Sequence, residues 1–283
     1  MPNARVIKNR IKTVKNTGKI TKTMAMVSTA KATKVVGLIK ASRPYANHLD
    51  SFLKGLSRSC DAHPLFMSNE LAERRLLIVI TANRGLCGGY NANLVRLAKE
   101  SAEEESSSIW MYGKKGVSAL RFAGVEMEKT ANDLKDIPVF DEALKLADMA
   151  VEAYERGEVS RVDVVYSEFV SAGQQKPKLD TLLPMTAPDS DEVQDAYGVE
   201  PIYHPDKESL LQTLIPKLIR LRFFKVLLDA AASEHLARQL AMNSASDNAN
   251  DMVKSLTLSY NRARQAQITT ELSEIVGGAE ALN

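Results

Sequence analysis

The chain has 283 residues, is 45% hydrophobic and 6% aromatic, and carries 37 basic against 35 acidic side chains. Its longest purely aliphatic run, Leu76–Ile80, is far shorter than the roughly 18–20 apolar residues that cross a bilayer, which argues against a membrane-spanning helix. The two cysteines, Cys60 and Cys87, make neither a disulfide framework nor a zinc site, so we expect a reducing compartment.

The charge is distributed unevenly along the chain. Residues 1–49 contain eleven Lys or Arg and no Asp or Glu, so residues 50–283 carry the remaining 26 basic side chains and all 35 acidic ones. A basic arm on an acidic body indicates an acidic partner surface. Nucleic acid is the generic partner, but the arm has no aromatic residue before Tyr45 on which bases could stack. The alternative is an acidic protein surface.

The first predicted element is a long helix over residues 1–58. Uncharged residues recur there at alternating spacings of four and three, which is the 3.5-residue repeat of a helix packed lengthwise against another helix. The repeat is small in its middle, so we expect the partner helix to approach closely between Gly18 and Ala32, and Pro44 to kink or interrupt the helix. The repeat consists of Ile7, Ile11, Val14, Gly18, Thr21, Ala25, Ser28, Ala32, Val35, Ile39, Ser42, Ala46, Leu49 and Leu53.

The sequence pattern changes in residues 59–205, where candidate strands alternate with candidate helices. This alternation predicts a Rossmann-like α/β domain with a mostly parallel sheet. The Pro- and Asp-rich end of this region predicts a linker over residues 186–205. The expected strands are 76–82, 109–113, 161–170 and 178–185, and the expected helices are 91–105, 114–123 and 140–155.

A second very long helix is predicted over residues 206–283. Only Pro216 interrupts the helical sequence before Gly277. Its apolar stripe weakens between residues 230 and 250 and returns at Val253. So polar a middle does not suit a core helix of a compact domain. We therefore expect it to pair with the first helix as an antiparallel coiled coil.

A glycine-rich segment, residues 84–91, lies between an expected strand and an expected helix. A phosphate-binding loop occupies this place in nucleotide-binding domains. The positions of Arg84, Gly85, Gly88 and Gly89 match neither GxGxxG nor the P-loop pattern, so a tight structural turn is favoured over nucleotide binding. Cys87 within it is expected to be a small buried packing residue rather than a reactive thiol.

Positive signs of catalysis are lacking. The four histidines share no metal-ligand spacing, and the sequence contains neither a nucleophile elbow nor HExxH. We expect no catalytic residue, no metal and no cofactor in this chain.

The closing segment carries a family resemblance. Residues 268–281 (ITTELSEIVGGAEA) resemble, position for position, the C-terminal signature of the γ subunit of F-type ATP synthases, and residues 260–266 are similar to that family's approach to the signature. Residues 7–11 and 16–27 resemble its N-terminal helix, and Arg84–Asn91 its central glycine motif. Asn83 stands where the family usually has Asp. The resemblance covers essentially the whole chain.

The resemblance implies a rotor without an active site of its own. The two terminal helices would form a shaft inside a ring of alternating α and β subunits, and the α/β domain would stand on the c-ring beside ε. The shaft would couple proton-driven rotation to ATP synthesis in the β subunits. The implied partner contacts are Lys19, Lys22, Met24, Arg238, Gln265, Thr269 and Glu271.

The resemblance also implies a location. The protein would be peripheral on the cytoplasmic face of a bacterial inner membrane, attached only through its partners. The matrix side of a mitochondrial inner membrane is less favoured, because no presequence is recognised.

Two other interpretations remain open. The chain could be an α/β nucleotide-binding protein that uses the Gly85–Gly89 loop, with its long helices as a dimerisation arm. It could also be a basic coiled-coil nucleic-acid binder, which would require an affinity that falls steeply with salt.

Overall fold

The computed structural model describes residues 4–56, 64–67, 69, 72–185 and 206–280, so the expected linker 186–205 lies outside the described residues. The chain divides into two compact units. Met1–Ser28 and Gln239–Asn283 form one, which we call the helical unit, and Thr29–Arg238 forms the other, which we call the α/β unit. Helices α1 (Ala4–Leu56) and α5 (Lys207–Glu280) each contribute to both.

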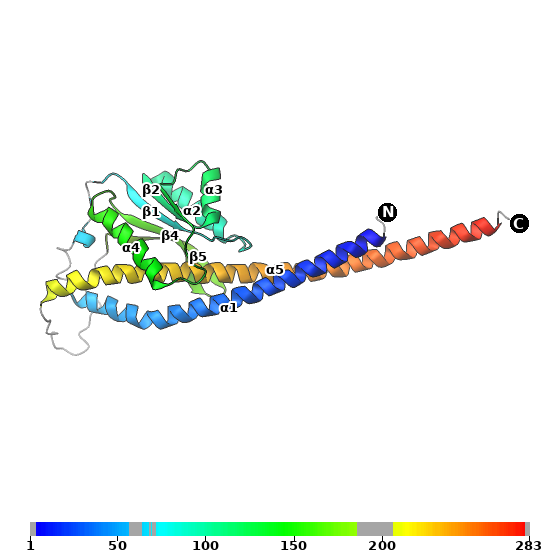
Figure 1. The fold of residues 1–283 in the computed structure, drawn as a ribbon, viewed down its shortest axis with the longest axis horizontal. Coiled ribbons are helices and arrows are strands. Elements are labelled where there is room, and N and C mark those ends of the chain that lie inside the picture. Colours follow the sequence, from blue (N-terminus) through cyan, green and yellow to red (C-terminus); the bar gives the residue numbers. More distant parts are fainter. Residues whose placement is uncertain (1–3, 57–63, 68, 70–71, 186–205, 281–283) are drawn as a thin grey trace. The chain divides into compact units, whose positions relative to one another are not determined.

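The middle of the α/β unit is a five-stranded sheet of order β3-β2-β1-β4-β5 (Figure 1). All neighbouring strands are parallel except β4 and β5, which are antiparallel, so the predicted mostly parallel sheet is confirmed. The prediction missed β3, because an edge strand of three residues carries no periodic signal. The strands are β1 (Arg75–Ile80), β2 (Ser107–Tyr112), β3 (Lys129–Ala131), β4 (Val162–Ser171) and β5 (Gln174–Leu183).

Helices cover both faces of this sheet, as alternation along β1 requires. Leu76, Ile78 and Ile80 belong to a core shared with α4 and α5, whereas Leu77 and Val79 belong to a second core shared with α2 and α3. A parallel strand buried on both faces reads as a continuous aliphatic run, which is why β1 could be recognised. The covering helices are α2 (Tyr90–Glu104), α3 (Lys114–Phe122) and α4 (Phe140–Glu155), and a 3₁₀ turn η2 spans Pro64–Phe66.

Helix α5 has two different environments. Nine of its residues between Leu211 and Ala230 belong to the hydrophobic core that α5 shares with the sheet and α4, among them Phe223, which is fully buried. The prediction that this helix cannot be a core helix is therefore wrong for its first part. The reason is that the apolar residues of α5 gather in the part that belongs to the α/β unit, which ends at Arg238, whereas most of the polar stretch 230–250 belongs to the helical unit.

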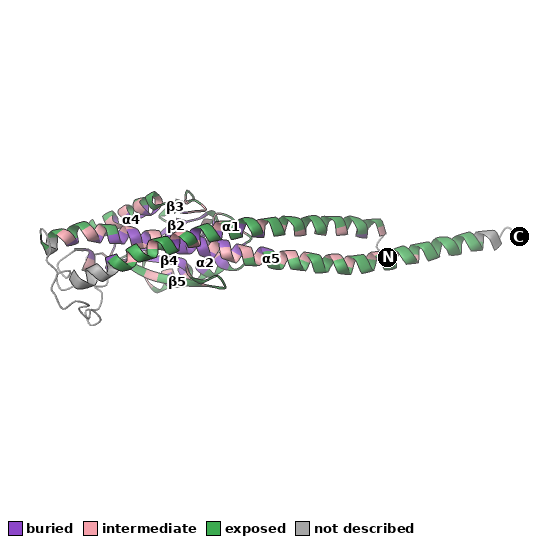
Figure 2. Ribbon diagram, turned by 90° about the horizontal axis from the view of Figure 1, so that it is seen from below, coloured by how far each residue is buried: buried purple, intermediate pink, exposed green. Residues whose placement is uncertain are grey.

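The predicted seam of α1 is confirmed. Every repeat position from Ile7 to Leu49 is buried or half-buried. In the α/β unit, Val35 and Ile39 pack against Leu228 and neighbouring alanines of α5. Figure 2 shows the helical unit mostly green, with half-buried positions recurring at intervals along its helices. Pro44 does not interrupt α1, because it is exposed and its ring removes one backbone hydrogen bond without meeting the core.

The close approach predicted near Gly18 is found within the helical unit. A β-carbon built on Gly18 would lie 3.3 Å from the β-carbon of Ala249 on α5. Gly37, also on α1, has no neighbouring atom within 4 Å of such a β-carbon. The two glycines therefore differ in what a side chain would meet, although both lie inside the same helix.

These two positions provide a matched test of the helix contact. We expect Gly37→Ala to raise the free energy of unfolding by about 1 kcal/mol, because alanine favours the helix and the added methyl meets open space. Gly18→Ala should gain less, and Gly18→Leu should destabilise the helical unit by forcing α1 away from α5. Urea unfolding followed by circular dichroism measures all three. Equal gains for the two alanine variants would contradict the close approach.

Candidate functional site

The carboxyl end of β1 is the place where open α/β sheets bind their ligands. The chain passes from β1 to β2 on one side and reaches β4 on the other, so a topological switch point lies at the end of β1. The glycine motif, residues 84–91, follows β1 and leads into α2. Leu86 and Gly88 have positive φ values of 62° and 58°, which makes the motif a tight turn.

The crevice at this switch point is filled by the protein's own α5. The Tyr90 hydroxyl donates a hydrogen bond to the Ala230 carbonyl of α5 at 3.2 Å. The space left between the end of β1 and residues such as Leu227 and Glu234 is about 30 Å³, enough for roughly one water molecule. A nucleotide does not fit there, so the nucleotide-binding interpretation of the glycine motif is not supported.

Arg238 of α5 fastens the helix to the glycine motif. Its guanidinium donates hydrogen bonds to the carbonyl oxygens of Arg84 and Gly85, each at 3.2 Å, and to the Glu234 carboxylate at 2.6 Å. The Arg238 side chain is only 8% exposed. The motif thus offers carbonyl oxygens to a cation of its own chain, instead of amide groups to a phosphate. Within the part of the chain that the structure describes, Gly88 and Gly89 form no hydrogen bond with Arg238, and they serve the turn and the start of α2.

His235 extends this arrangement to the segment before α4. Its Nε2 lies 2.7 Å from the Asp136 carbonyl oxygen, and its Nδ1 lies 3.4 Å from a guanidinium nitrogen of Arg238. The guanidinium can only donate and the carbonyl can only accept, so the ring is neutral with its proton on Nε2. Burial lowers the pKa of His235.

Asp136 also joins α1 to the same cluster. Its carboxylate pairs with Lys31 of α1 and lies 4.0 Å from the Arg84 guanidinium. The hydrogen bond from Lys31 lowers the pKa of Asp136. We call the cluster the Arg238 network; its members are Lys31, Arg84, Asp136, Glu234, His235 and Arg238.

Asn83, the one departure from the family pattern, has a structural task here. Its side-chain amide donates to the carbonyl oxygens of Asn132 and Leu134 at 3.2 and 3.3 Å, and its carbonyl oxygen accepts from the Lys114 backbone at 3.1 Å. An aspartate could accept but not donate, so it could not make the first two bonds. Cys87 is buried with its pKa raised by burial, as expected of a packing residue.

The other predicted contact residues lie on the helical unit. Lys19 and Lys22 of α1 are exposed, and Met24 is half-buried. On α5, Gln265, Thr269 and Glu271 are all exposed. The Thr269 hydroxyl donates to the Gln265 carbonyl at 3.0 Å, and Gln267 donates to the Glu271 carboxylate at 2.9 Å, so these polar groups are satisfied within one helix.

Sequence reasoning missed an exposed apolar face at the end of α5. Ile268, Leu272, Ile275 and Val276 are between 43% and 68% exposed, and their spacing places them on one side of the helix. The spacing of these four residues can be seen in the sequence, but the exposure of their side chains cannot. An apolar helical face open to solvent indicates contact with another chain.

Metal chemistry finds no support in the part of the chain that the structure describes. No group of three or more His, Cys, Asp or Glu side chains there is placed to hold a metal ion.

Comparison with known proteins gives full-length matches. The family model described as ATP synthase matches residues 3–282. The ATP synthase gamma chain of Leptospira biflexa is 40% identical over 290 residues and covers all of both chains. That of Geotalea daltonii is 43% identical over 289 residues, covering all of this chain and 99% of the relative.

Solved structures share the fold. A chain of the Euglena gracilis mitochondrial ATP synthase, in a structure of OSCP, F1 and c-ring, superposes with a TM-score of 0.71 at 24% identity, covering 99% of this chain and 94% of that chain. A chain from the central stalk and c-ring of the Tetrahymena thermophila enzyme gives a TM-score of 0.58 at 22% identity, covering 80% and 99%.

The internal bonds of Arg238 predict a cost in stability when it is replaced. We expect Arg238→Ala to lower the free energy of unfolding by about 2 kcal/mol or more, because two carbonyls and Glu234 lose a buried charged partner. The stability of Arg238→Lys should lie between those of the wild type and Arg238→Ala, because lysine keeps the charge but not the two-pronged guanidinium. Exposed Arg262→Ala is the control and should change stability by less than about 0.5 kcal/mol. Similar losses at both arginines in denaturant titrations would contradict the network.

His235 predicts a pH dependence of stability. The folded protein binds its proton less readily than the unfolded chain, so stability is complete above the ordinary histidine pKa of about 6.5 and falls as the pH drops below it. We expect the wild type to lose more stability between pH 7.5 and pH 5 than His235→Gln, which does not titrate. Thermal or urea unfolding at both pH values gives the difference. Parallel losses in the two proteins would show that the neutral ring contributes nothing.

Proposed function

The chain belongs to the ATP synthase gamma-chain family, and from this premise we propose how its two units do the work of that subunit. It is the central-stalk rotor subunit, with no catalytic site of its own, since catalysis resides in the β subunits of the complex. The observation that carries this conclusion is the match over the full length, with 40% identity covering all of both chains.

The partners follow from the family. The helical unit is proposed to lie within the ring of α and β subunits, and the α/β unit to contact ε and the c-ring. The fold agrees with this division. The helical unit exposes most of its side chains, whereas the α/β unit has large hydrophobic cores that include the first part of α5. Rotation of the helical unit would bias each β subunit in turn toward binding, synthesis or release of ATP.

The surface of the helical unit suits a rotating part. Lys19 and Lys22 present exposed charges, whose attraction to acidic loops of the β subunits is long-range and tolerant of angle. Met24 lies next to them on α1, and Gln265, Thr269 and Glu271 are proposed as contacts on α5. Short, buried and specific bonds would instead hold the rotor at one angle.

Arg238 is proposed to act from within the α/β unit. It bonds to the glycine motif, so its influence on partners would pass through the position in which it holds that motif and α5. Partner contact at this residue would involve the small exposed part of the guanidinium.

Attachment to the membrane is proposed to be peripheral. Within the described residues, no helix is both long enough and apolar enough to cross a bilayer. We place the protein on the cytoplasmic face of a bacterial inner membrane, held there by the c-ring.

A purification from native membranes tests the function. A tagged full-length chain, expressed in place of the native one, should bring down the α and β subunits together with ε in mild detergent. Recovery of the chain without α and β would overturn the proposed function.

Charge reversal tests the proposed contact surface. We expect Lys19→Glu combined with Lys22→Glu to lower proton-driven ATP synthesis several-fold, because repulsion replaces attraction toward acidic β-subunit loops. Lys34→Glu combined with Lys40→Glu is the matched control, since both lysines are exposed on α1 but belong to the α/β unit. ATP synthesis by inverted membrane vesicles is the measurement, normalised to the amount of assembled complex. Equal rates in the two double variants would rule out a special role for Lys19 and Lys22.

A further inference from the structure

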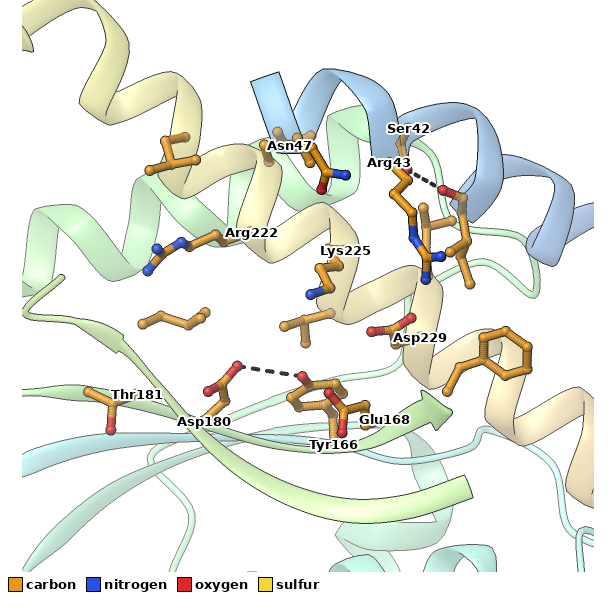
Figure 3. A pocket seen from close by; sticks show the side chains of 18 residues that line it. Ser42, Arg43, Asn47, Tyr166, Glu168, Asp180, Thr181, Arg222, Lys225 and Asp229 are labelled. Atoms are coloured by element: carbon orange, nitrogen blue, oxygen red, sulfur yellow. Dashed lines mark hydrogen bonds between the residues drawn. The ribbon is translucent and has the colours of Figure 1, made fainter. Parts of the chain in front are cut away.

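A second and much larger cavity lies in the α/β unit, apart from the crevice that α5 fills. Its volume is about 470 Å³, within the range of small-molecule sites. Figure 3 shows it between α1, α5 and the antiparallel pair β4 and β5.

The helical walls of this cavity are positively charged. Arg43 comes from α1, and Arg222 and Lys225 come from α5 (Figure 3). None of the three forms a salt bridge with any other residue that the structure describes. The three cations on the walls of this cavity, none of them in an ion pair with a described residue, are groups that an anion could bind.

The strand wall carries acids that already have a partner. Lys178 lies 3.4 Å from the Glu168 carboxylate and 3.5 Å from that of Asp180. The Tyr166 hydroxyl also donates to Asp180, at 3.5 Å. Within the described residues, neither acid forms an ion pair with the cations of the helical walls. Asp229 of α5 is the remaining acidic residue of the lining.

Apolar side chains complete the lining. Leu218, Leu221 and Val226 of α5 and Phe169 of β4 provide surface for a carbon skeleton. The cavity thus combines cations for an anionic group with a smaller apolar part, as in sites for small organic anions.

We propose that this cavity binds a small anion through its phosphate or carboxylate oxygens, held by Arg43, Arg222 and Lys225. Guanidinium groups match both kinds of oxygen pair, and ammonium groups bind either as point charges. A bound anion would bridge α1 to α5 within the α/β unit, and so fasten together the two helices that this unit holds.

Asp229 is an internal competitor for the same cations. Burial raises its pKa to about 6, while Lys225 and Arg43 act in the opposite direction. Above this pH the ionised carboxylate repels an anion, and below it the neutral carboxyl leaves the cations free. Anion affinity should therefore rise as the pH falls through 6. The charged and titratable groups around Asp229 are Arg43 on α1, Tyr166 and Glu168 on β4, Lys178 and Asp180 on β5, and Arg222 and Lys225 on α5.

Calorimetry with the full-length chain tests the site. The probes are inorganic phosphate, pyrophosphate and citrate, so that the phosphate and carboxylate classes are distinguished. We expect one class to bind with 1:1 stoichiometry, and Arg43→Gln or Lys225→Gln to weaken binding about tenfold, the equivalent of losing one charge-assisted hydrogen bond. Lys217→Gln, an exposed cation of α5 outside the cavity lining, should leave the affinity unchanged.

The role of Asp229 is tested separately. The probes themselves take up protons, so the comparison is between wild type and Asp229→Asn at each pH. We expect Asp229→Asn to bind several-fold more tightly than wild type at pH 7.5 and equally at pH 5.5. A constant ratio between the two proteins would overturn the competitor role.

Two results would overturn the site itself. One is the absence of binding heat with all three probes at both pH values. The other is binding that Arg43→Gln, Lys225→Gln and Arg222→Gln weaken no more than Lys217→Gln does. Thermal melting of each variant without a probe establishes that the variant is folded. Because the three substitutions are independent, the test still decides if one variant does not fold.

Discussion

The contact between α5 and the carboxyl end of β1 is the constraint on which the rest of the molecule depends. In an open α/β sheet this crevice normally receives a ligand. Here the Tyr90 hydroxyl bonds to the α5 backbone, and Arg238 bonds from α5 to the glycine motif. The α/β fold therefore holds α5 in a fixed position. Because α5 occupies the position where such sheets bind a ligand, this domain holds a helix of its own chain there.

A second consequence concerns how the two long helices are paired. In each unit α1 packs against α5 through a seam of mostly small or aliphatic residues, with Gly18 facing Ala249 in the helical unit and Val35 facing Leu228 in the α/β unit. The surrounding positions of α1 are exposed and rich in lysine. Cohesion is thus confined to the seam, and the outside is left polar and charged, a combination suited to a shaft that must move past several surfaces.

The same α5 shows three kinds of surface along its length. Its first part supplies core residues, including the fully buried Phe223, together with the cations of the 470 Å³ cavity. The Arg238 network follows, where buried charges are paired and hydrogen-bonded as buried charges must be. The last turns expose the apolar face that begins at Ile268. Each surface suits a different neighbour: the sheet, the glycine motif and another chain.

Local pattern determined much of this from the sequence alone. The seam from Ile7 to Leu49, the helix 140–155 and the aliphatic strand β1 depend on periodicities of a few residues, and the structure has them where they were expected. The family could likewise be recognised from the sequence, because its signatures are contiguous.

Only the tertiary structure decided the contacts between distant parts of the chain. The buried pair Arg75 and Asp163, 2.9 Å apart, joins β1 to β4. The sequence shows an arginine at position 238, but not that its side chain points inward. That direction depends on a hydrogen bond to the Gly85 carbonyl, 153 positions earlier in the chain. Such contacts have no local signal, since they exist only after the sheet has brought its strands and α5 together.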